Sequence, residues 1–85
     1  MKIIEIYTKD YCPYCKRAKA LLLDKGLSFT EYKIDEDPQL RPEMIQRANG
    51  GSTVPQIFIG ERHIGGCDDM MALVATNQFD NILAE

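Results

Sequence analysis

The chain has 85 residues, of which 45% are hydrophobic and 27% are charged, and its formal net charge is −3. This composition is that of a globular protein, and the length corresponds to one small domain over residues 1–85. The negative charge gives no electrostatic reason to bind nucleic acid, and no apolar run approaches the roughly 20 residues of a membrane-spanning helix.

The first half of the chain predicts a strand, a helix and a second strand. Residues 2–7 are rich in isoleucine and predict a buried strand, which is followed by a loop over Thr8–Tyr11. From Pro13 to about Lys25 the apolar positions recur at helical spacing, and Gly26 is a natural helix end. Residues 29–35 alternate between apolar and polar and predict a second strand. At these lengths the three elements form a right-handed βαβ unit with parallel strands.

The second half predicts two helices on either side of a hairpin, followed by a short helix. Pro42 breaks a helix when it lies deep inside one, so the regular part of the second helix is expected to begin near Arg41. The elements that follow are a helix end at Asn49-Gly50-Gly51-Ser52, a strand over Gln56–Ile59, a turn at Gly60-Glu61, a strand over Arg62–Ile64, a helix that begins at Asp68-Asp69, and a short helix with Phe79, Ile82 and Leu83.

The chemistry is expected where the first strand meets the first helix, at Cys12-Pro13-Tyr14-Cys15. Proline suits the first helical position, which places Cys12 at the helix N-terminus beside free N–H groups and the positive end of the helix dipole. We therefore expect Cys12 to be exposed and easily ionised. Cys15 lies one turn into the helix, with its sulfur closer to the core. Such a pair supports a reversible disulfide, because one thiolate attacks and the second thiol resolves.

The same cysteine spacing also occurs in half of a structural zinc site. The other candidate ligands are Cys67 and the single histidine, His63, so a mixed site is conceivable. Proline between the thiols and the following helix favour redox chemistry, and we expect no metal. Three cysteines do not form a closed disulfide framework, and the N-terminus has no features of a secretion signal. A lone pair of this spacing indicates a disulfide that cycles in a reducing compartment, and we expect the cytoplasm.

Three motifs in this order, namely Cys12-Pro13-Tyr14-Cys15, Thr53-Val54-Pro55 and Gly65-Gly66-Cys67-Asp68-Asp69, are similar to those of the glutaredoxins. The sequence most resembles the small bacterial dithiol type, over essentially the whole chain. The resemblance implies an α/β thioredoxin fold, in which a four-stranded mixed sheet has helices on both faces. It also implies glutathione as the co-substrate, with no permanently bound cofactor.

The resemblance further implies that glutathione lies along the second and third motifs. Val54 precedes a cis proline, and its free N–H and C=O would pair with the cysteine of glutathione, next to Thr53. An ordinary proline that opens a strand is the alternative. The N–H groups of Cys67 and Asp68 would hold the γ-glutamyl carboxylate, and Asp69, with Asp68 sharing the role, would accept the ammonium. Simple helix capping by both acids is the alternative.

Lys9 and Tyr14 flank the thiols in the family pattern. By resemblance, Lys9 meets the glycine carboxylate of glutathione. Gln46 and Arg47 are alternative partners for that carboxylate, although a solvated helix face explains these two residues equally well. A lone cysteine at a helix start is usually a small structural residue, but the place of Cys67 beside the ligand leaves its oxidation open. We interpret His63 as a solvated side chain without a catalytic role.

The function that follows is a glutathione-dependent thiol–disulfide oxidoreductase. Cys12 attacks a protein disulfide or a glutathionylated cysteine, and Cys15 resolves mixed disulfides with protein. The family suggests ribonucleotide reductase as one substrate, and we expect a monomer.

One alternative is a thioredoxin-like protein reduced by a flavoprotein, but thioredoxins lack the Gly65–Asp69 motif. Another is an iron–sulfur or metal carrier bridged across a dimer through Cys12, which Pro13 disfavours within the family.

Overall fold

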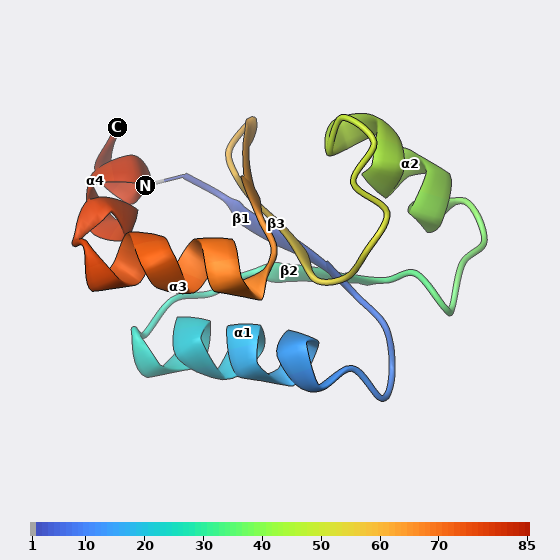
Figure 1. Cartoon of the computed structure of the whole chain (residues 1–85), viewed down its shortest axis with the longest axis horizontal. Coiled ribbons are helices and arrows are strands. Elements are labelled where there is room, and N and C mark those ends of the chain that lie inside the picture. Colours follow the sequence, from blue (N-terminus) through green and yellow to red (C-terminus); the bar gives the residue numbers. More distant parts are fainter. Residues whose placement is uncertain (1) are drawn as a thin grey trace.

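The protein is represented by a computed structural model that describes residues 2–85 (Figure 1). Strands and helices alternate in the first half of the chain, and helices dominate its end. The elements in chain order are β1 (Ile4–Thr8), α1 (Pro13–Asp24), β2 (Thr30–Lys33), α2 (Leu40–Arg47), β3 (Gln56–Ile59), β4 (Arg62–Gly65), α3 (Cys67–Ala75) and α4 (Gln78–Ala84).

The four strands form one mixed sheet in the order β2-β1-β3-β4. β1 lies parallel to β2 and antiparallel to β3, and β3 pairs antiparallel with β4. The crossover from β1 to its parallel neighbour β2 runs through α1, as the spacing of the first three elements predicts. This arrangement confirms the thioredoxin fold. It also brings the end of β1, which leads into Cys12, next to the start of β3, because Tyr7 pairs with Gln56.

Helices cover both faces of the sheet (Figure 1). Successive side chains of β1 point to opposite faces, so that Ile4 and Ile6 enter one core while Tyr7 enters the other. Buried residues of α1, α3 and α4 complete the first core, and α2 contributes Met44 to the second. The first core contains Ile4, Ile6, Ala18, Leu22, Ile57, Ile59, Cys67, Met70, Phe79, Ile82 and Leu83. The second contains Tyr7, Met44, Ala48 and Phe58.

The helices begin close to the expected positions. α2 starts at Leu40, one residue earlier than predicted, because Pro42 falls within the first turn, where no intrahelical partner for its missing N–H is required. α3 starts at Cys67 instead of Asp68, and β4 extends to Gly65. The longest helix, α1, has 12 residues. Within residues 2–85, none of the helices has the length and apolar character that crossing a membrane requires.

Candidate active site

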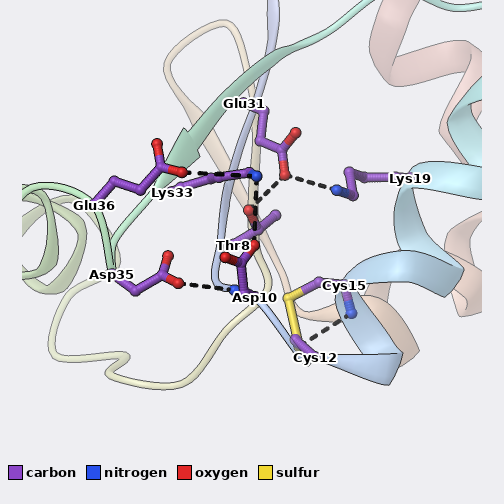
Figure 2. Close-up of polar contacts among 9 residues, drawn as sticks. All are labelled: Thr8, Asp10, Cys12, Cys15, Lys19, Glu31, Lys33, Asp35 and Glu36. Carbon is purple, nitrogen blue, oxygen red and sulfur yellow. Dashed lines mark hydrogen bonds and ion pairs between the residues drawn. A yellow bond between two sulfur atoms is a disulfide. The ribbon is translucent and has the colours of Figure 1, made fainter.

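Cys12 and Cys15 form a disulfide at the N-terminus of α1 (Figure 2). Cys12 is the N-cap residue in an extended conformation, and Pro13 takes the first helical position, as the sequence predicts. The Cα atoms of the two cysteines are 5.2 Å apart. The backbone N–H of Cys15 donates to the sulfur of Cys12 over 3.2 Å. The first turn of α1 therefore supplies a donor to Cys12, and such a donor stabilises a thiolate at this position.

The expectation that Cys12 is exposed is wrong for this disulfide form. Only 7% of the Cys12 surface is accessible, compared with 1% for Cys15. One side of the Cys12 sulfur is bonded to Cys15, and another faces the carbonyl oxygen of Val54 at 3.9 Å. Val54 is 42 residues away in sequence, so helix geometry alone does not reveal this cover. Cys12 remains the more accessible residue of the pair.

The segment before β3 presents a free backbone edge to the disulfide. The Val54–Pro55 peptide bond is cis, as the resemblance implies. Val54 lies outside β3, and no main-chain hydrogen bond in residues 2–85 involves its N–H or C=O group. An extended peptide can therefore pair with Val54 without displacing a main-chain hydrogen bond.

A groove of about 380 Å³ runs from this edge to the start of α3. It brings together most of the predicted site residues, namely Tyr14, Thr53, Val54, Pro55, Cys67, Asp68 and Asp69, along with Gly66. Cys12 and Lys9 lie in a neighbouring cavity of about 460 Å³, which shares Thr53 and Val54 with the groove. The two hollows thus meet at Thr53 and Val54, and Cys12 lines the second of them. The second hollow also contains Arg41, a cation that the sequence analysis did not select because it belongs to none of the three motifs.

The start of α3 is built around Gly65 and Asp69. Gly65 has φ of +116°, and a Cβ atom at this position would lie 2.9 Å from the Cγ atom of Asp69. The absence of a side chain therefore lets the Asp69 carboxylate fold back over the helix start. There it accepts the N–H of Gly66 over 2.9 Å. Capping by Asp69 is thus confirmed, and its role toward an ammonium group stays a prediction. Asp68 is exposed.

Comparisons with known proteins agree with this geometry. Residues 4–64 match the sequence model of the glutaredoxin family. The chain belongs to the glutaredoxin family. It is 58% identical to glutaredoxin 3 of Escherichia coli strain K12 over 83 residues, which are 98% of this chain and 99% of that protein.

Solved glutaredoxin structures share the fold. The structure of a glutaredoxin from Brucella melitensis matches 98% of this chain and 89% of its own chain, with a TM-score of 0.84 and 51% identity. A buckwheat glutaredoxin–glutathione complex matches 98% of this chain and 77% of its own, with a TM-score of 0.88 and 30% identity. The protein is thus a glutathione-dependent thiol–disulfide oxidoreductase, and its Cys12–Cys15 disulfide fits the paired-cysteine active site of the family.

A polar network holds the loop that precedes Cys12 in this family member (Figure 2). The hydroxyl of Thr8 and the ammonium of Lys19 both donate to one carboxylate oxygen of Glu31, over 2.6 and 2.8 Å. The last residue of β1 and the second residue of β2 are thereby joined to α1, one turn beyond Cys15. The N–H of Asp10 also donates to Asp35 over 3.1 Å. The backbone entering the active site is therefore fixed from two sides.

Arg47 pairs with two residues of the sheet in this structure. Its guanidinium donates to both carboxylate oxygens of Glu5, over 3.0 and 3.3 Å, and to the hydroxyl of Tyr7 over 2.9 Å. It also lies 4.2 Å from the centre of the Phe58 ring. These contacts fasten the end of α2 to the sheet, so they account for Arg47 without a ligand, and its role toward a ligand carboxylate stays a prediction. Gln46 is exposed beside it, and its role stays a prediction.

Cys67 is a buried residue of the first core, with 4% of its surface exposed. Its thiol donates to the sulfur of Met71 over 3.8 Å. Burial raises the pKa of the Cys67 thiol, which lowers its thiolate fraction and hence its reactivity. The structure therefore favours the interpretation of Cys67 as a small packing residue beside the groove.

His63 is half-buried, so the expectation of a solvated side chain is wrong. Its ring lies 5.0 Å from the ring of Phe58, and its Nε2 atom is 2.6 Å from the side-chain oxygen of Gln56. Sequence reasoning missed both His63 and Gln56, because their contact depends on the pairing of β3 with β4. The mixed zinc site is not assembled either: within residues 2–85 no three His, Cys, Asp or Glu side chains gather as metal ligands would.

Proposed function

We propose that the protein reduces protein disulfides and glutathione–protein mixed disulfides, with glutathione as the electron donor. The observation that carries this proposal is the position of the Cys12 sulfur. It lies at a helix N-terminus and 3.9 Å from the free backbone edge of Val54. A peptide thiol paired with that edge would be held beside the reactive sulfur.

The reduced dithiol acts on a protein disulfide in two exchanges. The Cys12 thiolate attacks one substrate sulfur, which breaks the substrate disulfide and releases one substrate thiolate that takes up a proton. Cys15 then loses its proton and attacks the Cys12 sulfur of the mixed disulfide. This second exchange forms the Cys12–Cys15 disulfide and releases the second substrate thiolate. Two electrons have passed from the dithiol to the substrate.

Glutathione restores the dithiol by the same chemistry in reverse. One glutathione thiolate attacks Cys12, which breaks the internal disulfide and releases Cys15 as a thiol. A second glutathione attacks the glutathione sulfur of this intermediate, so that glutathione disulfide leaves and Cys12 returns as a thiolate. With a glutathionylated protein, Cys12 takes the glutathione directly and releases the protein thiol. Only the second glutathione is then needed, and Cys15 takes no part.

The groove has complementary groups for an extended γ-glutamyl peptide. We place the ligand cysteine against Val54, flanked by Thr53, Pro55 and Tyr14. The N–H groups of Cys67 and Asp68 open α3 and would hold the γ-glutamyl carboxylate, because a helix N-terminus favours anions. The Asp69 carboxylate, which already caps the same turn, would accept the ammonium group. At the other end, Lys9 would meet the glycine carboxylate from the cavity it shares with Cys12.

The decisive experiment compares two assays on the Cys15→Ser variant. Reduction of a glutathionylated protein should continue, because a solution glutathione resolves the intermediate. Reduction of a protein disulfide should fall strongly, because the mixed disulfide with protein loses its internal resolving thiol. The Cys12→Ser variant is the matched control and should lose both activities. Equal losses in both assays for Cys15→Ser would contradict this division of roles.

The reductant is tested by coupling turnover to two recycling systems. Glutathione with glutathione reductase should support reduction of the disulfide substrate, whereas thioredoxin reductase should not. The opposite result would favour the thioredoxin-like alternative.

We further propose that residues 1–85 act as one monomeric domain in the reducing cytoplasm, with no permanently bound cofactor. The sheet and three of the helices share one core, and every thiol that the cycle needs comes from Cys12, Cys15 or glutathione. Gel filtration tests the monomer, and a coloured purified protein would point to the iron–sulfur alternative. Ribonucleotide reductase remains one substrate to assay.

A further inference from the structure

Two hydrogen bonds connect His63 on β4 to the edge of the glutathione groove. The Nε2 atom of His63 lies 2.6 Å from the side-chain oxygen of Gln56. The side-chain nitrogen of Gln56 donates to the backbone carbonyl of Thr53 over 3.0 Å. Thr53 is the residue before Val54, and both line the groove. Gln56 thus links His63 on β4 to the loop that presents the free backbone edge of Val54.

The pairing of β3 with β4 creates this contact. Gln56 and Phe58 are two residues apart on β3 and therefore share one face of the sheet. His63 is the partner of Phe58 across the strands, so that its ring packs on the Phe58 ring and reaches diagonally to Gln56. A register shift after this pair sets Gly65 opposite Ile57. β4 therefore ends in Gly65, whose φ is positive and which directly precedes Gly66, the N-cap residue of α3.

The chemistry of the three groups determines the direction of both bonds. A backbone carbonyl only accepts, so the amide nitrogen of Gln56 must face Thr53 and its oxygen must face His63. The Nε2 atom of His63 must then carry a proton and donate it. Gln56 has 5% of its surface exposed, and an amide at that depth is costly to leave without partners. His63 therefore fixes the orientation of Gln56, and Gln56 in turn fixes the Thr53 carbonyl.

We propose that His63 and Gln56 are positioning residues that hold the Thr53–Pro55 segment in the geometry needed to pair with glutathione. The inference rests on the proposed function, because it names the residues that shape the edge to which glutathione would bind. Neither side chain lines the groove or the cavity of Cys12, so both act through Thr53. The segment from Asn49 to Pro55 has no helix or strand of its own. A side-chain bond is therefore a major restraint on its carbonyl.

Two substitutions break the connection at different bonds. Gln56→Met retains the approximate size of the side chain and removes both hydrogen bonds. His63→Phe retains a ring on Phe58 and removes only the donor to Gln56. Gln78→Met is the matched control, because Gln78 is an exposed residue of α4 outside both hollows. Each protein is assayed at varied glutathione concentration with a saturating glutathionylated protein, and the alkylation rate of reduced Cys12 is measured separately.

If His63 and Gln56 act by positioning, replacing them should raise the KM for glutathione and leave the chemical step unchanged. Gln56→Met should raise the KM for glutathione about three- to tenfold, the usual effect of losing one or two neutral hydrogen bonds. His63→Phe should raise it by a smaller factor, and the double variant should be no worse than Gln56→Met alone, because both changes interrupt one connection. The kcat and the Cys12 alkylation rate should stay within about twofold of wild type. A purely structural defect would instead lower the active fraction and leave the KM unchanged.

A spectroscopic measurement tests the bond directly in the unmodified protein. The nitrogen chemical shifts of neutral His63 should report a proton on Nε2, and this preference should weaken in Gln56→Met. A proton on Nδ1 in the wild type would overturn the inference whatever the kinetics show. If wild type turns over glutathione and both variants match Gln78→Met, the inference is wrong and the proposed function stands. If wild type itself does not turn over glutathione, the proposed function fails, while the His63 proton still decides whether the connection exists.

Discussion

Replacing Gly65 by alanine should damage the fold and the ligand site together. Gly65 is buried and has φ of +116°, a conformation that residues with a side chain rarely adopt. A Cβ atom at this position would lie 2.9 Å from the Cγ atom of Asp69 and 3.0 Å from its Cβ atom. The Asp69 side chain would have to move, and it would then lose the N–H of Gly66.

The expected cost has two parts. The positive φ angle accounts for roughly 1–2 kcal/mol in the free energy of unfolding. Loss of the Asp69 cap adds about 0.5–2 kcal/mol. The sum, about 1.5–4 kcal/mol, is a large fraction of the roughly 5–15 kcal/mol that stabilises a small domain. Because Asp69 is also the proposed ammonium acceptor, the KM for glutathione should rise as well.

Gly50→Ala is the matched control for the first part. Gly50 has φ of +98°, but no atom lies within 4 Å of a Cβ added there. Its cost should therefore reflect backbone conformation alone and fall about 0.5–2 kcal/mol below that of Gly65→Ala. Urea denaturation of the two variants measures this difference. The double variant Gly65→Ala/Asp69→Ala should lose less free energy of unfolding than the sum of the losses in the two single variants. Equal costs for Gly65→Ala and Gly50→Ala would refute the proposed collision with Asp69.

Three further results are expected. Asp69→Ala should lower glutathione turnover about ten- to a hundredfold, since a hydrogen bond to a charged group contributes about 1.5–3 kcal/mol, and wild-type kinetics would leave Asp69 as a helix cap only. The hydrogen bond from Arg47 holds the pKa of Glu5 below its ordinary value of 4.5. The stability that ionised Glu5 adds is therefore fully present above pH 4.5 and disappears as the pH falls through the folded-state pKa. Urea denaturation from about pH 3 to 7 should therefore show wild type more stable than Glu5→Gln at neutral pH and the two curves converging in acid, whereas a constant gap would contradict the Glu5–Arg47 contact. Reduced Cys12 should react with iodoacetamide at a rate that is already near its plateau at neutral pH, and a midpoint near 8.5, as for a free thiol, would show that the helix start does not activate it.

The order of elements and the redox motif could be predicted from the sequence because they depend on local patterns. Apolar periodicity and turn residues located the strands and helices to within a few residues. Pro13 after Cys12 placed the reactive pair at a helix start, since that position needs no N–H. The three motifs together also predicted the residues that line the groove from Tyr14 to Asp69, which the structure brings into contact from α1, the segment before β3 and the start of α3.

Tertiary structure alone decided which groups the side chains in and around the site contact. The cover over Cys12 comes from Val54, and Arg47 is held by Glu5 and Tyr7, 42 and 40 residues away. His63 contacts Gln56 only because of its register with Phe58, which is set by the sheet and not by the composition of the hairpin. Local sequence specifies backbone conformation through short-range sterics and hydrogen bonds. The environment of each side chain depends on contacts between distant segments, which form only when the sheet and its helices pack together.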